Sequence, residues 1–308
     1  MTTNAIQSSH IYSTYFAPRG RSRIYTLGMQ IAQLYLSPFD QIIGFIGEAG
    51  SGKSVLIKGM FPGIELTNDD DGVNVRPLPL LEQEYETGFF TPHTYHLDIR
   101  FETGFHQLSE LADAVRLAVR RGKRIIIEHF DLIYPLLGVN ANLLIGVGEQ
   151  IVITRPNLFG PLPQELCDIV YPSLAYRLMA HSAEDLCEYV MTQEQMLACS
   201  HGDIRHGFVL EFNEHQPDID IPTLEARVNE LIRQDLPIDY YDESHILLGG
   251  AQHYCTGPRT HVRSTGRIIG FRLLDHFIYD HFHKTYMLVG CVGDDSEENI
   301  RRLETIHG

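Results

Sequence analysis

The chain has 308 residues, of which 44% are hydrophobic and 21% charged, with a formal net charge of -16. This length favours two domains of ordinary globular composition. No apolar stretch reaches the roughly 18 residues of a membrane-spanning helix, and the negative charge gives no general attraction for a polyanion. The first residues lack a signal-peptide pattern, and the five scattered cysteines do not resemble a disulfide framework. We therefore expect a cytoplasmic protein with reduced thiols and no membrane contact.

The first half of the chain alternates short apolar runs with helical patterns. The expected strands are residues 41–46, 64–67, 94–101, 124–133 and 150–154, and the expected helices are 54–61 and 108–121. Strands that alternate with helices favour an α/β domain with a mostly parallel sheet. In such a sheet the ligand site lies at the carboxyl ends of the strands.

A phosphate-binding motif stands between the first of these strands and the helix after it. Gly47 to Ser54 reads GEAGSGKS, which matches GxxxxGK[ST] in full. The glycines allow backbone amides to face an anion, Lys53 would contact the β and γ phosphates, and Ser54 would bind Mg2+. The sequence therefore predicts a site for ATP or GTP with Mg2+. Its expected binding residues are Gly47, Glu48, Ala49, Gly50, Ser51, Gly52, Lys53, Ser54 and Val55.

Acidic side chains near this loop are candidates for metal binding and catalysis. Glu128 and Asp131 follow a buried strand, and either acid could lie near the metal; we assign Glu128 a catalytic role with Lys53, and Asp131 to the Mg2+. In the acidic turn after the expected second strand, Asp70 and Asp71 are candidates to supply a general base to a substrate hydroxyl or to orient the metal, and we assign the catalytic role to Asp70.

These features together resemble a known group of enzymes. GEAGSGKS, the acidic turn and the segment IIIEHFDLI look like the P-loop kinases of the uridine kinase and phosphoribulokinase type. His129 stands where that group has glycine. The resemblance implies a P-loop fold and a kinase-like phosphotransferase or nucleoside triphosphatase.

The pattern changes after the stretch RPNLFGPLPQEL, which contains three prolines and a glycine. We place the domain junction there, giving domains 1–163 and 164–308. A long helix over 173–195, a strand over 204–212, and helices over 223–234 and 297–306 follow. This order predicts an α+β domain.

Four segments of the second half resemble the second additional, or editing, domain of alanyl- and threonyl-tRNA synthetases. They read RLMAHSAEDL, EARVNELIRQDLP, CTGPRTHV and STGRIIG. The resemblance implies a zinc site, here on His181, Asp185, Cys255 and His261, and an amino-acid-like or tRNA-like ligand. His181 and Asp185 are four residues apart on one helical face, and zinc accepts such a mixed N/O/S set. Asp185 replaces the second histidine of that family.

Three functions remain open at this stage. The first is a P-loop phosphotransferase or triphosphatase fused to an editing-like domain. The second is a zinc-dependent aminoacyl-tRNA deacylase that the nucleotide regulates. The third is a non-catalytic binding protein that the nucleotide gates.

Overall fold

The computed structural model describes residues 11–64, 66, 94–213 and 215–307, and it divides into two compact units. Unit 1 contains residues 11–15 and Ser22–Pro172. Unit 2 contains Phe16–Arg21 and the residues from Ser173 onward. Helix α7 (Pro163–Val190) begins in unit 1 and ends in unit 2, so the two units are continuous within one helix.

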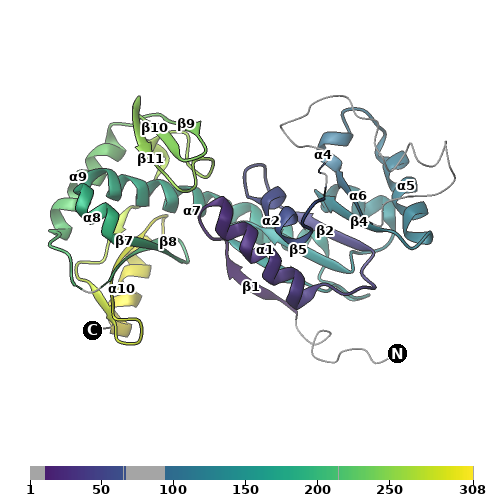
Figure 1. Ribbon diagram of the computed structural model, residues 1–308, viewed down its shortest axis with the longest axis horizontal. Helices are drawn as coiled ribbons and strands as arrows, with labels where there is room; N and C mark the ends of the chain where they lie inside the picture. The colour runs from purple at the N-terminus through teal and green to yellow at the C-terminus, as the bar shows by residue number, and fades with distance from the viewer. Residues whose placement is uncertain (1–10, 65, 67–93, 214, 308) are drawn as a thin grey trace. The chain divides into compact units, whose positions relative to one another are not determined.

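Unit 1 is built on a six-stranded sheet with the order β1-β6-β5-β2-β4-β3 (Figure 1). Its strands are β1 (Ser13–Phe16), β2 (Ile42–Ile46), β3 (Thr94–Asp98), β4 (Arg124–Glu128), β5 (Leu143–Val147) and β6 (Gln150–Thr154). Strand β2 runs parallel to both of its neighbours, β4 and β5, and β3 runs parallel to β4. Strand β6 is antiparallel to β5.

The register of these strands brings three chain segments to one edge of the sheet. Phe45 pairs with Glu128, and Asp98 also pairs with Glu128. Since the carboxyl ends of parallel strands meet at the same edge, the loop after β2 starts beside Glu128 and Asp98.

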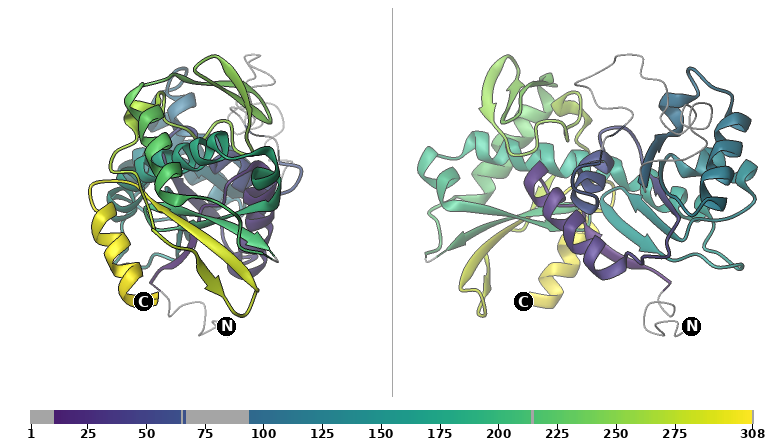
Figure 2. Two further views of the ribbon diagram at one scale, coloured as in Figure 1. Left: turned by 90° about the vertical axis from the view of Figure 1, so that its left-hand side faces the viewer. Right: turned by 45° about the vertical axis from the view of Figure 1, so that its right-hand side comes forward.

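Helices cover the sheet of unit 1, whose central strands β2 and β5 are buried along their whole length. The helices are α1 (Arg21–Tyr35), α2 (Lys53–Met60), α4 (Ile99–Glu102), α5 (Leu108–Arg120) and α6 (Phe130–Leu137). The apolar faces of α5 and α6 share one core with β2 and β4. Helix α1 lies beside α2, where Gly28 and Gly59 allow the two backbones to approach (Figure 2). Buried strands of this kind are typical of parallel sheets covered on both faces.

The structure confirms the predicted positions of β2, α5 and β6 and corrects two other elements. The expected strand over 94–101 ends at Asp98, whose side chain accepts a hydrogen bond of 3.1 Å from the amide of Phe101 and caps helix α4. The expected strand over 124–133 ends at Glu128, and α6 begins at Phe130. Ile64 and Leu66 lie outside any strand. Asp70 and the rest of the acidic turn lie outside the described residues.

Unit 2 combines two antiparallel sheets with long helices (Figure 1). One sheet has the order β12-β14-β8-β7 with β13 beside β14, and the other has the order β11-β10-β9. The strands are β7 (Cys199–Ile204), β8 (Gly207–Asn213), β9 (Ile238–Asp242), β10 (His245–Leu248), β11 (Ala251–Tyr254), β12 (Arg272–Leu273), β13 (Ile278–Asp280) and β14 (Thr285–Cys291). The helices are α7, α8 (Gln193–Ala198), α9 (Ile221–Arg233), the short 3-10 turn η2 (Thr265–Arg267) and α10 (Ser296–His307).

Helix α7 and the β7–β8 hairpin differ from the sequence predictions in extent. Helix α7 begins at Pro163, ten residues before the expected start at 173, because proline is favoured in the first turn of a helix. The expected single strand over 204–212 is the second half of a hairpin, in which β7 pairs antiparallel with β8. In the described part of the chain, no helix combines the length and the apolar character needed to cross a membrane.

Candidate functional site

The loop after β2 turns sharply because glycines occupy its strained positions. Gly47, Gly50 and Gly52 have φ angles of 153°, 79° and 93°, a region that favours glycine. A Cβ atom on Gly47 would lie 2.5 Å from the carbonyl oxygen of Val147. The loop therefore needs glycine at these positions, and it leads directly into α2, which begins at Lys53.

Lys53 folds back onto the loop that precedes it. Its Nζ atom donates hydrogen bonds of 2.9 Å to the carbonyl oxygens of Gly47 and Glu48 and lies 3.7 Å from Oε2 of Glu128. The side chain is 5% exposed. Burial lowers the pKa of Lys53, and the carboxylates of Glu128 and Asp98 oppose that shift. The lysine cation therefore lies against the loop and donates to two neutral carbonyl groups, which are weaker acceptors than an anionic ligand would be.

Glu128 is the acid that contacts the loop residues. Its Oε1 atom accepts a hydrogen bond of 3.3 Å from Ser54 Oγ and lies 3.1 Å from Nε2 of His96. Burial alone would raise the pKa of Glu128, but the hydrogen bond from His96 and the charges of His96 and Lys53 outweigh it and lower that pKa. An ionised carboxylate beside a serine hydroxyl provides the hard oxygen ligands that Mg2+ prefers.

Two neighbours of Glu128 were missed in the sequence. Asp98 and His129 each offer a ligand atom, and with Glu128 these atoms lie within 4.8 Å of one another. His129 has a φ angle of 56°, and within the described residues its buried Nδ1 atom has no hydrogen-bond partner. Burial and the charges of Lys53 and Arg100 lower the pKa of His129 to about 4, so its imidazole is neutral at pH 7. Asp98 is the last residue of the buried strand β3, and an acid at the end of an apolar strand was the sequence signal that could have found it.

The other predicted acid lies in a different environment. Burial raises the pKa of Asp131, although its own backbone amide, the charge of Arg100 and a hydrogen bond from Tyr171 oppose the shift. Arg100 contacts the loop itself, since its Nη1 atom donates a hydrogen bond of 3.0 Å to Glu48. The structure thus places Glu128 beside Ser54, and it places Asp131 beside Tyr171.

A second polar cluster lies inside unit 2, on the buried face of α7. Arg19, which is 1% exposed, donates hydrogen bonds to the carboxylates of Glu184 and Asp185. Its Nη2 atom also lies 3.2 Å from Cys255 Sγ. Arg19 comes from a short segment far from α7 in the sequence, so no local pattern indicated this role. The guanidinium supplies the charge that two buried carboxylates need.

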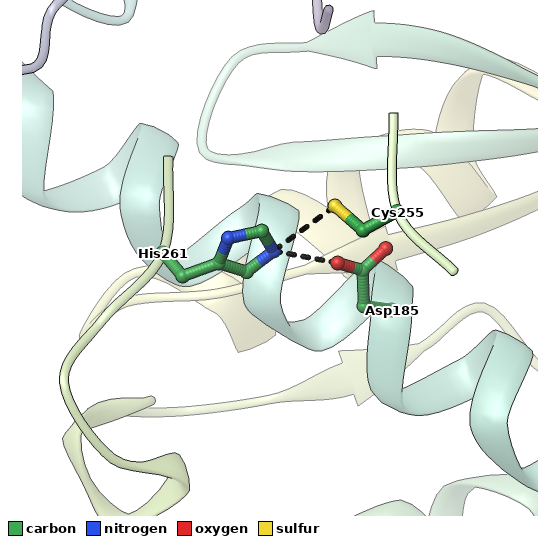
Figure 3. Close-up of side chains that lie close together, drawn as sticks. All are labelled: Asp185, Cys255 and His261. Atoms are coloured by element: carbon green, nitrogen blue, oxygen red, sulfur yellow. Dashed lines mark hydrogen bonds and ion pairs between the residues drawn. The ribbon is translucent and has the colours of Figure 1, made fainter. Parts of the chain in front are cut away.

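Three of the four predicted zinc ligands meet in this cluster (Figure 3). His261 Nε2 lies 2.5 Å from Asp185 Oδ2 and 3.7 Å from Cys255 Sγ. Burial and the charge of Arg19 lower the pKa of His261 to about 3, so its imidazole is neutral. His181, the fourth predicted ligand, has its Nε2 atom 3.9 Å from Asp203 Oδ1 instead.

The donor chemistry of Asp185, Cys255 and His261 suits zinc. Arg19, however, donates to two of these three groups, so a metal ion would have to displace its guanidinium. Zinc at these residues therefore stays a prediction of the sequence resemblance.

Comparison with known proteins adds no assignment. No protein-family model matches the chain, and no curated protein matches it at a significant level. The functional proposals below therefore rest on the polar clusters around Lys53 in unit 1 and Arg19 in unit 2.

Proposed function

We propose that unit 1 binds the phosphates of ATP or GTP together with Mg2+ and transfers or hydrolyses the γ-phosphoryl group. One observation carries this proposal. Lys53, Ser54 and Glu128 meet at the carboxyl ends of two adjacent parallel strands, directly after a loop whose strained positions are glycines. Polyphosphate sites in parallel sheets are built at this place, from backbone amides at the start of a helix and one lysine.

Each residue has a task in this account. Lys53 exchanges its carbonyl acceptors on Gly47 and Glu48 for phosphate oxygens and stabilises the charge that develops on the γ-phosphoryl. Ser54 and Glu128 would hold the Mg2+, which neutralises phosphate charge when it is bound. His96 keeps Glu128 ionised and oriented through its hydrogen bond.

A phosphotransferase also needs a group that accepts the proton of the attacking hydroxyl. Asp70 remains the prediction from the sequence and lies outside the described residues. Asp98 ends β3, the strand on the far side of β4 from β2, and its carboxylate lies within 4.8 Å of the ligand atoms of Glu128 and His129. We propose that Asp98 accepts this proton, in the way that a positioned carboxylate serves as a general base.

Phosphate release from ATP and GTP, measured with the full chain and Mg2+, tests the proposed chemistry. We expect release, or transfer to an added hydroxyl acceptor, that is lost in Lys53→Ala and kept in Lys123→Ala. Lys123 is a suitable control because it lies in the turn between α5 and β4, at the opposite end of β4 from Glu128. Release that persists at the same rate in Lys53→Ala would contradict the proposal.

The cluster in unit 2 supports a second candidate function, because Asp185, Cys255 and His261 converge there from segments far apart in the chain. The resemblance to the editing domains makes this function the deacylation of mischarged tRNA. Release of alanine or serine from such tRNA should then be lost in Cys255→Ala. A chain that releases neither amino acid while unit 1 is active would reject this function and leave the phosphotransferase proposal intact.

A further inference from the structure

Unit 2 contains another group of metal-binding side chains, one turn further along α7. Glu188 extends from the helix, and Cys199 and His201 extend from β7. Cys199 Sγ lies 3.6 Å from Glu188 Oε1, and His201 Nε2 contacts the same oxygen atom. Residues two apart on a strand point to the same face, so β7 presents the thiol and the imidazole together toward the carboxylate.

The spacing of these donors suits a small tetrahedral ion. Zinc binds carboxylate oxygen at about 2.0 Å and sulfur at about 2.3 Å, which places two such ligands about 3.5 Å apart in tetrahedral geometry. The observed distance between Cys199 Sγ and Glu188 Oε1 is 3.6 Å, and the three ligand atoms lie within 4.8 Å of one another. The thiol and the carboxylate are therefore already at the right separation, whereas the His201 ring and the Glu188 carboxylate, which are in contact, would have to move apart to bind one ion.

The cluster is protected on one side and accessible on the other. The side chain of Glu188 is 5% exposed, whereas that of His201 is 18% exposed and Cys199 is half-buried. The partly exposed side chains of His201 and Cys199 give an ion access to the cluster from solvent. Three protein ligands with an opening to solvent leave a fourth position for water.

Charge also favours a cation at this place. Arg19 donates to Glu184, Asp185 and Cys255, whereas Glu188 contacts a thiol and an imidazole. A divalent ion here would bind Cys199 as the thiolate, with release of the thiol proton to solvent.

A further histidine lies near the same carboxylate. His253 Nε2 is buried and has no hydrogen-bond partner among the described residues. A ligand atom of His253 lies within 4.8 Å of ligand atoms of both Asp185 and Glu188, so this imidazole is close enough to be a reserve ligand.

We propose that Glu188, Cys199 and His201 bind a divalent transition metal ion, with zinc as the best match to one oxygen, one sulfur and one nitrogen donor. This site adjoins the cluster of Asp185, Cys255 and His261, where Arg19 already supplies the cation, but it shares none of those three residues. It goes beyond the function proposed for unit 1 and does not depend on it.

Cobalt binding to the metal-free full chain tests this site, because thiolate ligation of Co2+ gives a characteristic near-ultraviolet charge-transfer band. We expect the band to saturate at one equivalent of Co2+ per chain and zinc to abolish it by competition. The band should be lost in Cys199→Ser, and the affinity should fall at least tenfold in His201→Asn. The charge-transfer band and the Co2+ affinity should both be unchanged in the matched variants Cys291→Ser and His283→Asn, which change the same residue types outside the metal-binding clusters.

Two results would overturn the proposal: no thiolate band in the wild-type chain, or a band that survives Cys199→Ser and disappears in Cys255→Ser. Far-ultraviolet circular dichroism checks that each variant folds. Alkylation of the cysteines in the wild-type chain, mapped by mass spectrometry, tests metal binding at Cys199 without a substitution. Zinc should protect Cys199 from alkylation, and equal modification with and without zinc would reject the site.

Discussion

The two units each place a cation beside buried carboxylates, but they hold it in different ways. In unit 1, Lys53 donates to two backbone carbonyl groups and lies 3.7 Å from Glu128. In the proposed function, an anionic ligand replaces these carbonyl acceptors. In unit 2, the planar guanidinium of Arg19 donates to Glu184, Asp185 and Cys255. We propose that this difference separates the two cations. Lys53 donates to neutral carbonyl groups, which a phosphate can replace, whereas Arg19 donates to carboxylates, which a ligand cannot easily replace.

The largest effect should follow from removing the fixed cation of unit 2. Arg19→Met leaves Glu184 and Asp185 buried without a counter-charge, which should destabilise unit 2 by about 3–5 kcal/mol. Hydrogen exchange of the β8 amides measures the free energy of unfolding of this unit. Arg21→Ala is the matched control, because Arg21 forms an exposed ion pair with Glu243 and should cost less than about 1 kcal/mol. Equal losses of stability in Arg19→Met and Arg21→Ala would contradict the account of Arg19 as the fixed counter-charge of the buried carboxylates.

The next effect concerns the proposed base in unit 1. Asp98→Asn keeps an oxygen atom that can accept the amide of Phe101, but it can no longer take a proton from a substrate. We expect turnover to fall by roughly 100-fold or more, with nucleotide affinity unchanged. Steady-state kinetics and calorimetry separate the two quantities. A parallel loss of affinity and turnover would show that Asp98 serves the fold or the nucleotide instead.

Acid should weaken unit 2 through its neutral histidine. The pKa of His261 is about 3 in the folded chain and near 6.5 when exposed, so the unfolded state binds more protons between these values and stability falls as the pH drops. The loss attributable to His261 should be roughly 2 kcal/mol between about pH 6.5 and pH 4.5. Glu188 opposes this loss over the same range, because its raised pKa contributes stability at low pH that is lost as the pH rises toward 7. The contribution of His261 is therefore measured as the difference in pH dependence between the wild-type chain and His261→Asn in urea titrations.

The smallest effect concerns backbone strain at His129. Its φ angle of 56° is unfavourable for a residue with a Cβ atom, and its buried Nδ1 atom lacks a partner among the described residues. His129→Gly relieves this strain but also removes a buried imidazole, so the two effects oppose each other and we expect the stability of unit 1 to change by less than about 1 kcal/mol. Thermal unfolding measures the change. A larger loss of stability would show that the imidazole makes favourable contacts that outweigh the strain.

The sequence predicted what depends on short, continuous segments. The glycine-rich turn after β2, the burial of β2 and the helical face of α5 all follow from local spacing, and the structure contains these elements where they were expected. Phosphate binding by the turn stays a prediction. Asp98 was missed because the alternation of residues 94–101 favours one strand, whereas its carboxylate caps a new helix at that point. Strand β5 was missed although its apolar run resembles that of β2, because no motif marks its end as the glycine-rich turn marks the end of β2.

The polar cluster of unit 2 was only partly predictable for a different reason. Asp185, Cys255 and His261 could be named from a resemblance, but Arg19 reaches them from 166 residues before Asp185. Contacts between segments this far apart depend on tertiary packing, and no local pattern specifies them. The same limit applies to Glu188, which meets Cys199 and His201 only once β7 packs against α7.

The central proposal is that Lys53 of unit 1 binds the phosphates of a nucleoside triphosphate in place of the carbonyl groups that it now contacts. Isothermal titration of the full chain with ATP and with GTP in magnesium buffer tests it most directly. The account predicts saturable heat of binding for at least one nucleotide, and its loss in Lys53→Ala. An absence of heat at millimolar nucleotide, or binding that Lys53→Ala leaves unchanged, would contradict it.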